Sequence, residues 1–253
     1  MRIELEVMGV QKDGNAPTEN EDAAAPEHSA VLTEDTLHVA VADGATESLF
    51  SGLWARLLAR EYARGLLCEP SELLQALPGL QRRWLAEVEG RELPWYAQEK
   101  LREGAFATLL GVSLARTPTR GDGVVGTWSA LAVGDSCLFQ VRDEQLVRSF
   151  PLELASSFGS RPFLVSTHGA QNARVVEQAR GVTGEVRAGD TLLLMTDALA
   201  HWFLAEHERG GRPWRALPGE GSRSSFESFV AGLRAARSIR NDDTTLMRLS
   251  VGA

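Results

Sequence analysis

Acidic residues recur beside short apolar runs along this chain. Asp43 directly follows "LHVAVA", Asp135 follows "SALAVG" and Asp197 follows "TLLLMT". Asp242 and Asp243 directly precede "TTLMRLSV". Apolar runs of this length are typical of buried strands. If these strands share sheets, their carboxylates could converge at one edge and bind a common ligand.

Glu21 and Asp22 add a fifth acidic segment, at the edge of the short run "AAA". Converging carboxylates repel each other and are costly to remove from water. A divalent cation among them makes such a cluster tolerable, and oxygen ligands favour Mg²⁺, Mn²⁺ or Ca²⁺ over zinc. Each acid taken alone is more simply a turn residue after a strand. The set of five segments is what points to a metal site.

Gly44 follows Asp43 directly. A residue without a Cβ lets the backbone come close to a ligand, and the Gly44 carbonyl could itself bind a metal ion. An Asp-Gly pair after a strand is also ordinary turn chemistry.

Apolar periodicity and turn residues divide the chain into elements that could position these acids. The predicted strands cover residues 2–10, 37–42, 105–116, 124–135, 137–142, 145–150, 173–181, 189–197 and 244–251. The predicted helices cover residues 45–67, 70–90, 94–102, 198–208 and 224–240. Residues 12–29 and 151–172 are expected to be irregular, and Pro78 is expected to bend or break the second helix.

The helices fall into two groups that must cover sheet faces, which favours an α+β layered sandwich with antiparallel pairing over alternating βαβ units. Residues 1–253 contain no long polar linker, so we expect a single domain. With 43% hydrophobic residues, the chain can bury a sizeable core.

Overall charge and composition exclude several classes of protein. The formal charge is -8 and basic residues form no run, which argues against nucleic-acid binding. No apolar run approaches the length of a membrane span. The only cysteines are Cys68 and Cys137, with no CxxC motif, which predicts a reducing compartment such as the cytoplasm.

An ordered series of motifs spans nearly the whole chain. These are "NED" at 20–22, "VADG" at 41–44, "GAFATLL" at 104–110, "VGDS" at 133–136, "TDA" at 196–198 and "NDDTT" at 241–245. The series resembles that of the metal-dependent type 2C protein phosphatases, in their compact bacterial form. No single motif is specific, but the ordered set is. The resemblance implies a four-layer α/β/β/α sandwich, in which helices flank two mainly antiparallel sheets.

The resemblance also implies a role for each acid. Asp43 would bridge two Mg²⁺ or Mn²⁺ ions, and the Gly44 carbonyl would bind one of them. Asp197 and Asp242 would complete the first ion site and Glu21 the second. A weaker third ion would bind Asp135, while Asp22 would orient bound water.

The implied activity is hydrolysis of phosphoserine and phosphothreonine on proteins, as part of signalling. Two metal ions about 4 Å apart turn a shared water into a hydroxide that attacks phosphorus in line. Asp43 and Asp22 would then be the catalytic residues, and a phosphorylated protein would be the partner.

This chain departs from the family pattern at positions that handle substrate. Pro17 stands where the family often has an arginine that grips the phosphate, and Ala45 stands where animal enzymes have a histidine. Ala198 replaces a glycine, and Cys137 replaces a frequent arginine. The alternative is therefore a catalytically weak or inactive phosphatase-like module with a regulatory binding role.

Two further alternatives remain open in the sequence. Lys12, Arg161 or Arg240 could substitute for the missing arginine. A two-metal nuclease would use similar carboxylates, but the net charge of -8 argues against it.

Overall fold

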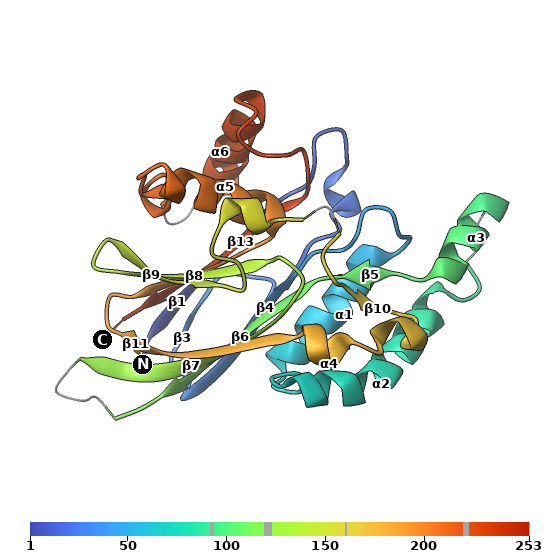
Figure 1. Cartoon of the computed structure of the whole chain (residues 1–253), viewed down its shortest axis with the longest axis horizontal. Coiled ribbons are helices and arrows are strands. Elements are labelled where there is room, and N and C mark those ends of the chain that lie inside the picture. The colour runs from blue at the N-terminus through green and yellow to red at the C-terminus, as the bar shows by residue number, and fades with distance from the viewer. Residues whose placement is uncertain (92–93, 119–122, 160, 220–222, 253) are drawn as a thin grey trace.

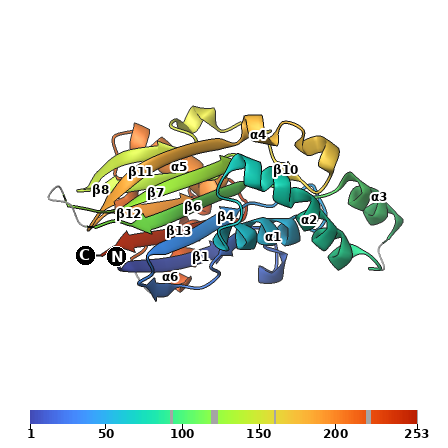
Figure 2. The same ribbon diagram turned by 90° about the horizontal axis from the view of Figure 1, so that it is seen from below.

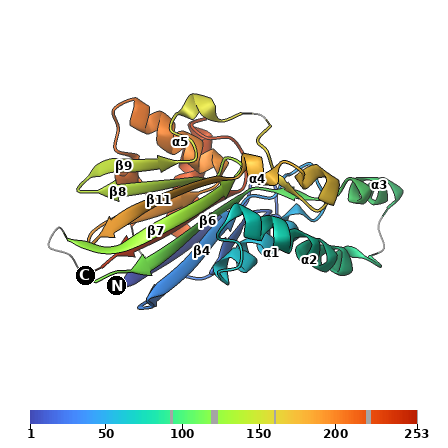
Figure 3. The same cartoon turned by 60° about the horizontal axis from the view of Figure 1, so that its bottom comes forward.

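Two antiparallel sheets form the centre of the structure, a computed structural model that describes residues 1–91, 94–118, 123–159, 161–219 and 223–252 (Figure 1). The first sheet has the strand order β3 (Ala30–Leu32), β1 (Ile3–Val10), β13 (Thr244–Val251), β12 (Thr191–Met195), β8 (Cys137–Arg142) and β9 (Gln145–Phe150). The second has the order β11 (Arg180–Arg187), β7 (Val124–Val133), β6 (Leu109–Arg116), β4 (Thr36–Ala42) and β2 (Ala23–Ala25). Figure 3 shows β4, β6, β7 and β11 side by side.

Helices cover the outer faces of both sheets. The second sheet is covered by α1 (Ser51–Ala63) and α2 (Pro70–Val88), which lie in front of β4 and β6 when the molecule is seen from below (Figure 2). The first sheet is covered by α5 (Asp197–Glu208) and α6 (Arg223–Ala235). Two more helices, α3 (Trp95–Glu103) and α4 (Val175–Gln178), lie at the end near α2, where β5 (Phe106–Ala107) pairs with β10 (Val165–Ser166).

Side-chain alternation along the strands explains the four layers. In β4, Leu37, Val39 and Val41 belong to the core between the sheets, whereas Ala40 and Ala42 face α1. In β12, Leu192 and Leu194 point between the sheets, and the intervening Leu193 and Met195 pack under α5. Because successive residues of a strand face opposite sides, strands with apolar residues on both faces must be covered twice. The predicted α/β/β/α sandwich is confirmed.

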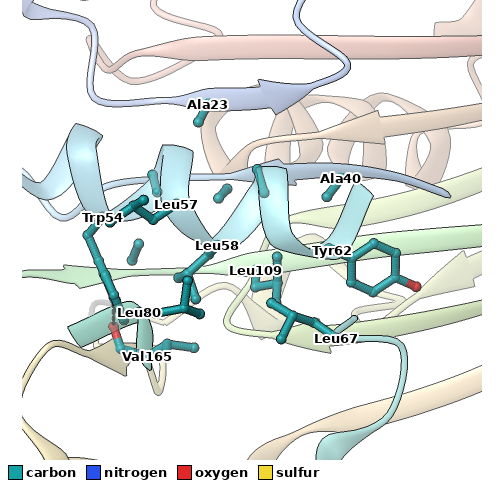
Figure 4. Close-up of a cluster of buried hydrophobic side chains, with 14 of the residues drawn as sticks. Ala23, Ala40, Trp54, Leu57, Leu58, Tyr62, Leu67, Leu80, Leu109 and Val165 are labelled. Carbon is teal, nitrogen blue, oxygen red and sulfur yellow. Dashed lines mark hydrogen bonds between the residues drawn. The ribbon is translucent and has the colours of Figure 1, made fainter. Parts of the chain in front are cut away.

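The core under α1 fixes this helix to the second sheet (Figure 4). Trp54, Leu58 and Tyr62 are fully buried, and Trp54 Nε1 donates a hydrogen bond to the carbonyl of Val165 at 2.9 Å. The Tyr62 ring lies so close to Gly111 that a Cβ there would come within 2.2 Å of it. Gly111 is therefore needed for the close approach of α1 to β6.

Of the two predicted effects of Pro78, a bend or a break, the break does not occur, because α2 runs through this residue. Pro78 lies on the exposed side and lacks only one donor, while Leu77, Leu80 and Trp84 bury the opposite side. Packing of that apolar face outweighs the loss of a single hydrogen bond.

The strand prediction for residues 173–181 is also wrong at its start, since Val175–Gln178 form α4. The strand begins at Arg180 and continues to Arg187 as β11, at the edge of the sheet. Among its residues only Val186 is buried, so its apolar pattern is weak. The predicted loop at residues 12–29 contains β2, whose three alanines carry little strand preference.

The first predicted helix starts later than expected, at Ser51 rather than residue 45. Phe50 takes a left-handed conformation with φ of 58° and marks the helix start. Within the described ranges, no helix combines the length and the apolar character that crossing a bilayer would require.

Candidate functional site

The strand ends next to the acids meet at one edge of the sandwich. In the second sheet, the last residue of β4 pairs with the first of β2, and the end of β7 lies opposite the start of β6. In the first sheet, the end of β12 lies opposite the start of β13. Asp43, Asp135, Asp197 and Asp242 follow or precede these ends and line one pocket of about 500 Å³. Each sheet thus contributes two aspartates to the pocket, and Glu47, in the loop after β4, adds a fifth carboxylate.

Asp43 is held by its backbone at the centre of this group. Its N–H donates to Thr108 Oγ1 at 2.9 Å, and the Thr108 N–H donates back to the Asp43 carbonyl at 2.8 Å. Burial raises the pKa of Asp43 well above its usual range, and repulsion by Asp22 and Asp197 adds to the increase. Asp43 is therefore a carboxylate that a positive ion would stabilise.

Asp197 is the first residue of α5, where the helix dipole favours a negative charge. Its Oδ1 atom is buried and has no hydrogen-bond partner among the described residues. Oδ2 lies 3.9 Å from Arg240 Nη1, too far for a hydrogen bond. Burial and the charge of Asp242 raise the pKa of Asp197. An unpartnered buried oxygen is costly, so this atom fits a ligand of the pocket.

Asp135 lies in the same pocket with 6% of its surface exposed. Burial raises the pKa of Asp135 to about 7, and the charge of Asp197 contributes to this shift. At neutral pH this side chain is therefore close to half-protonated unless a cation offsets its charge.

Asp22 and Asp243 are buried and do not line this pocket; Asp22 lines a separate cavity of about 250 Å³. Thr196 Oγ1 donates to Asp22 Oδ2 at 2.9 Å, while Asp22 Oδ1 lacks a partner within the described part of the chain. Burial raises the pKa of Asp22 well above its usual range, and Asp243 adds repulsion. Asp243 accepts hydrogen bonds from the backbone N–H groups of Lys12 (2.8 Å) and Glu21 (2.7 Å). It therefore fixes the segment that carries Glu21, a role that sequence reasoning missed.

Glu21 does not line the pocket, because both of its carboxylate oxygens are engaged elsewhere. Oε1 accepts a hydrogen bond from Ser51 Oγ, and Oε2 lies 3.5 Å from Lys12 Nζ. Ser51 opens α1 next to this carboxylate. The Lys12 ammonium therefore supplies positive charge at Glu21 in this structure.

Gly44 is buried, and the structure gives a packing reason for the missing side chain. A Cβ at Gly44 would lie 2.7 Å from the Ser51 carbonyl carbon and 2.8 Å from the Glu21 carbonyl oxygen. These are backbone atoms, which cannot move aside as a flexible side chain can. Gly44 therefore allows the loop after β4 to pack against the start of α1 and the Glu21 segment.

Arg234 of α6 was also missed by sequence reasoning, since an arginine on an amphipathic helix is usually solvated. Its side chain is only 6% exposed and donates to the carbonyls of Gln11 (3.0 Å) and Asp242 (2.6 Å). It also pairs with Asp13. Arg234 thus fixes the loop that presents Asp242 to the pocket.

The described His, Cys, Asp and Glu side chains include no group of three placed closely enough to hold a metal ion in their present positions. The four pocket aspartates instead line its wall.

The sequence of residues 15–240 matches the family model described as Protein phosphatase 2C. The chain belongs to the protein phosphatase 2C family. This is a family of metal-dependent protein serine/threonine phosphatases. A search of curated proteins found no significant match.

Solved structures share the phosphatase 2C fold with this chain at low sequence identity. The Mycobacterium tuberculosis serine/threonine phosphatase PstP/Ppp has a TM-score of 0.62 and 17% identity, with 100% of each chain covered. The S. agalactiae serine/threonine phosphatase has a TM-score of 0.59 and 14% identity, with 98% of this chain and 99% of that chain covered. The catalytic domain of PstP, in complex with two manganese ions, has a TM-score of 0.56 and 17% identity, and covers 99% of this chain and 100% of its own.

Positions where this phosphatase 2C chain departs from the family pattern lie in different surroundings. Pro17 is exposed in a 3₁₀ turn, Pro17–Glu19, and does not line the pocket. Ala45 lines the pocket without offering a polar group. Cys137, at the start of β8, and Ala198, in the first turn of α5, are both buried in the core under this helix, and Cys137 Sγ donates to the Asp135 carbonyl at 3.3 Å.

Proposed function

We propose that this protein hydrolyses phosphoserine and phosphothreonine on other proteins with two bound Mg²⁺ or Mn²⁺ ions, and that residues 1–253 act as one domain. The observation that carries the proposal is the pocket lined by Asp43, Asp135, Asp197 and Asp242. Membership of the phosphatase 2C family supports it. The manganese ions of the PstP catalytic domain support the choice of metal.

The residues present fit divalent cations. Asp197 Oδ1 is a buried oxygen without a described partner, and three of the four pocket aspartates have raised pKa values. In the proposed arrangement Asp43 would contact both ions, and the Gly44 carbonyl would bind one of them. Asp197 and Asp242 would hold the first ion, Glu21 would hold the second, and Asp135 would serve a weaker third site.

Divalent ions held there would activate a water molecule and offset negative charge on the phosphoryl oxygens. Side chains of the protein would position the water molecule and the aspartates for this reaction. Asp22, held by the Thr196 hydroxyl, keeps a buried Oδ1 without a described partner, and in the proposed site this atom would accept a hydrogen bond from the water. Thr108 forms hydrogen bonds with both the N–H and the carbonyl of Asp43, which limits the movement of Asp43 during the reaction.

Hydrolysis of p-nitrophenyl phosphate and of phosphoserine and phosphothreonine peptides tests the proposal. We expect turnover that requires Mn²⁺ and is abolished by chelation. The Asp43→Asn variant should lose it, while Glu87→Gln, on the exposed side of α2, should keep it. Equal turnover by Asp43→Asn and the wild type would exclude the proposed mechanism.

A second candidate function, a weak or inactive phosphatase-like module that binds a regulatory partner, is favoured by one observation. The Lys12 ammonium lies 3.5 Å from Glu21, where the second ion would have to bind. This candidate predicts saturable Mn²⁺ binding by calorimetry with no turnover of any phosphopeptide. Robust turnover would exclude it.

A further inference from the structure

Two arginines line the pocket together with the four aspartates and Glu47. Arg161 follows the 3₁₀ helix Ala155–Ser157, and Arg240 lies just before Asp242. They come from segments almost 80 residues apart in the sequence, yet both reach the same cavity. A phosphate monoester that enters this cavity would meet both guanidinium groups.

The other candidate cations are placed less well for this task. Residue 17 is an exposed proline away from the pocket. Lys12 does not line the pocket, and its ammonium lies between Glu21 Oε2 at 3.5 Å and Thr46 Oγ1 at 3.3 Å. The Lys12 ammonium is already paired with the Glu21 carboxylate, so it is less able to bind a substrate phosphate.

Arg240 is close to the acids without being bound by them. Its Nη1 lies 3.9 Å from Asp197 Oδ2, and 59% of its side chain is exposed. By contrast, Arg234 donates to three different oxygen atoms and is almost fully buried. Arg240 therefore keeps its hydrogen-bond donors available at the pocket, next to the carboxylates that would hold the ions.

Arg161 is exposed and forms no ion pair with any other residue of the described ranges. A guanidinium presents parallel N–H donors that match two phosphate oxygens, which gives strong and directional binding. Two such groups beside a metal site would compensate the charge of a phosphate dianion that the five carboxylates of the pocket would otherwise repel.

We propose that Arg240, together with Arg161, binds the phosphate group of the substrate and takes the place of the arginine that this chain lacks at residue 17. This inference rests on the proposed function. It makes Arg240 a substrate-binding residue and assigns Arg161 a supporting contact, so the selectivity for a phosphate dianion comes from the C-terminal loop and not from the N-terminal segment.

Calorimetric titration of inorganic phosphate into the Mn²⁺-loaded protein tests the inference. We expect Arg240→Ala to weaken phosphate binding about tenfold to a hundredfold, Arg161→Ala to weaken it less, and the double variant to weaken it most. Arg240→Lys should recover part of the loss, because it keeps the charge but not the planar fork. The Arg148→Ala variant, on the exposed side of β9, is the matched control and should bind phosphate like the wild type.

Two further readouts separate this role from a structural one. The affinity for Mn²⁺, titrated without phosphate, should stay within about twofold in Arg240→Ala. The KM for a phosphopeptide should rise by about the same factor as the phosphate dissociation constant.

Phosphate affinity in the double variant within twofold of the wild type would overturn the inference, as would a loss that appears in Lys12→Met but not in Arg240→Ala. If the wild type hydrolyses phosphopeptides while the double variant still binds phosphate normally, only this inference fails. If the wild type binds phosphate through Arg240 but hydrolyses no phosphopeptide, the proposed function fails and the phosphate site remains.

Discussion

Two aspartates with buried carboxylate oxygens lie on either side of β12, and their surroundings are opposite. Asp190 comes directly before the strand and is 1% exposed. Arg142 donates to it from Nε at 2.8 Å and from Nη2 at 2.7 Å, and Gln140 and the Arg187 N–H donate as well. Asp197 follows the strand and has one buried oxygen without a described partner.

The comparison distinguishes an acid that stabilises the fold from an acid whose carboxylate is available to bind a ligand. Both follow from the same sequence pattern, an acid beside an apolar strand. At Asp190 the protein itself supplies the compensating charge and hydrogen bonds, so the acid is structural. At Asp197 the neighbours are mostly other acids, and compensation has to come from outside. The pairing of a carboxylate, rather than its burial, therefore separates the two roles.

The largest expected effect is on turnover. Asp197→Asn should lower Mn²⁺-dependent hydrolysis of an aryl phosphate about a thousandfold or more, because it removes a proposed metal ligand. Asp190→Asn, corrected for the folded fraction, should stay within a few-fold of the wild type. Similar losses of turnover in the two variants would remove the distinction between them.

The second largest expected effect is on stability, and here the change at Asp190 should matter more than the change at Asp197. Asp190→Ala should lower the free energy of unfolding by about 3 kcal/mol, because it leaves Arg142 and Gln140 without their buried partner. In metal-free protein, Asp197→Ala should cost less or even stabilise, since it relieves repulsion with Asp242. Urea unfolding in the presence of a chelator measures both. A smaller loss for Asp190→Ala than for Asp197→Ala would contradict the assignment.

Addition of Mn²⁺ should stabilise the native state by about 2.7 kcal/mol at an ion concentration one hundred times the dissociation constant. For a chain of this size we expect the melting temperature to rise by about 5–10 °C. Asp190→Asn should melt at a lower temperature without metal, but Mn²⁺ should raise its melting temperature by the same amount. Asp197→Asn should lose most of it, and a full increment in this variant would place the ion elsewhere.

The smallest effect concerns pH in the absence of metal. The folded state binds the Asp135 proton with a pKa of about 7, against an ordinary value of 3.8. Because the folded protein then holds the proton more tightly than the unfolded chain, stability falls as pH rises between these values. The free energy of unfolding, measured by urea titration in chelator, should therefore drop by about 1 kcal/mol or more from pH 5.5 to pH 8, with a weaker drop in Asp135→Asn. A free energy of unfolding that rises over this range would contradict the prediction.

The strand ends and their acids could be predicted from the sequence because apolar alternation is a local signal. The two large sheets, α5 and β13 follow from it. Apolar alternation failed at β11, whose edge position leaves few buried residues. At Pro78 the sequence left a bend or a break open, and packing of the apolar face lets α2 continue. Local patterns also missed the contact between Asp243 and the backbone of Lys12, 231 residues away in sequence. Whether an acid is paired depends on such distant contacts, so Asp190 and Asp197 could not be separated before the fold was known.

A crystal structure of the manganese-loaded protein, with anomalous scattering recorded at the manganese edge, tests the central claim most directly. We predict manganese peaks in the pocket within coordination distance of Asp43, Asp197 and Asp242, and none at Asp190. Manganese bound only away from Asp43 and Asp197, or a saturated crystal with no peak in the pocket, would contradict the account.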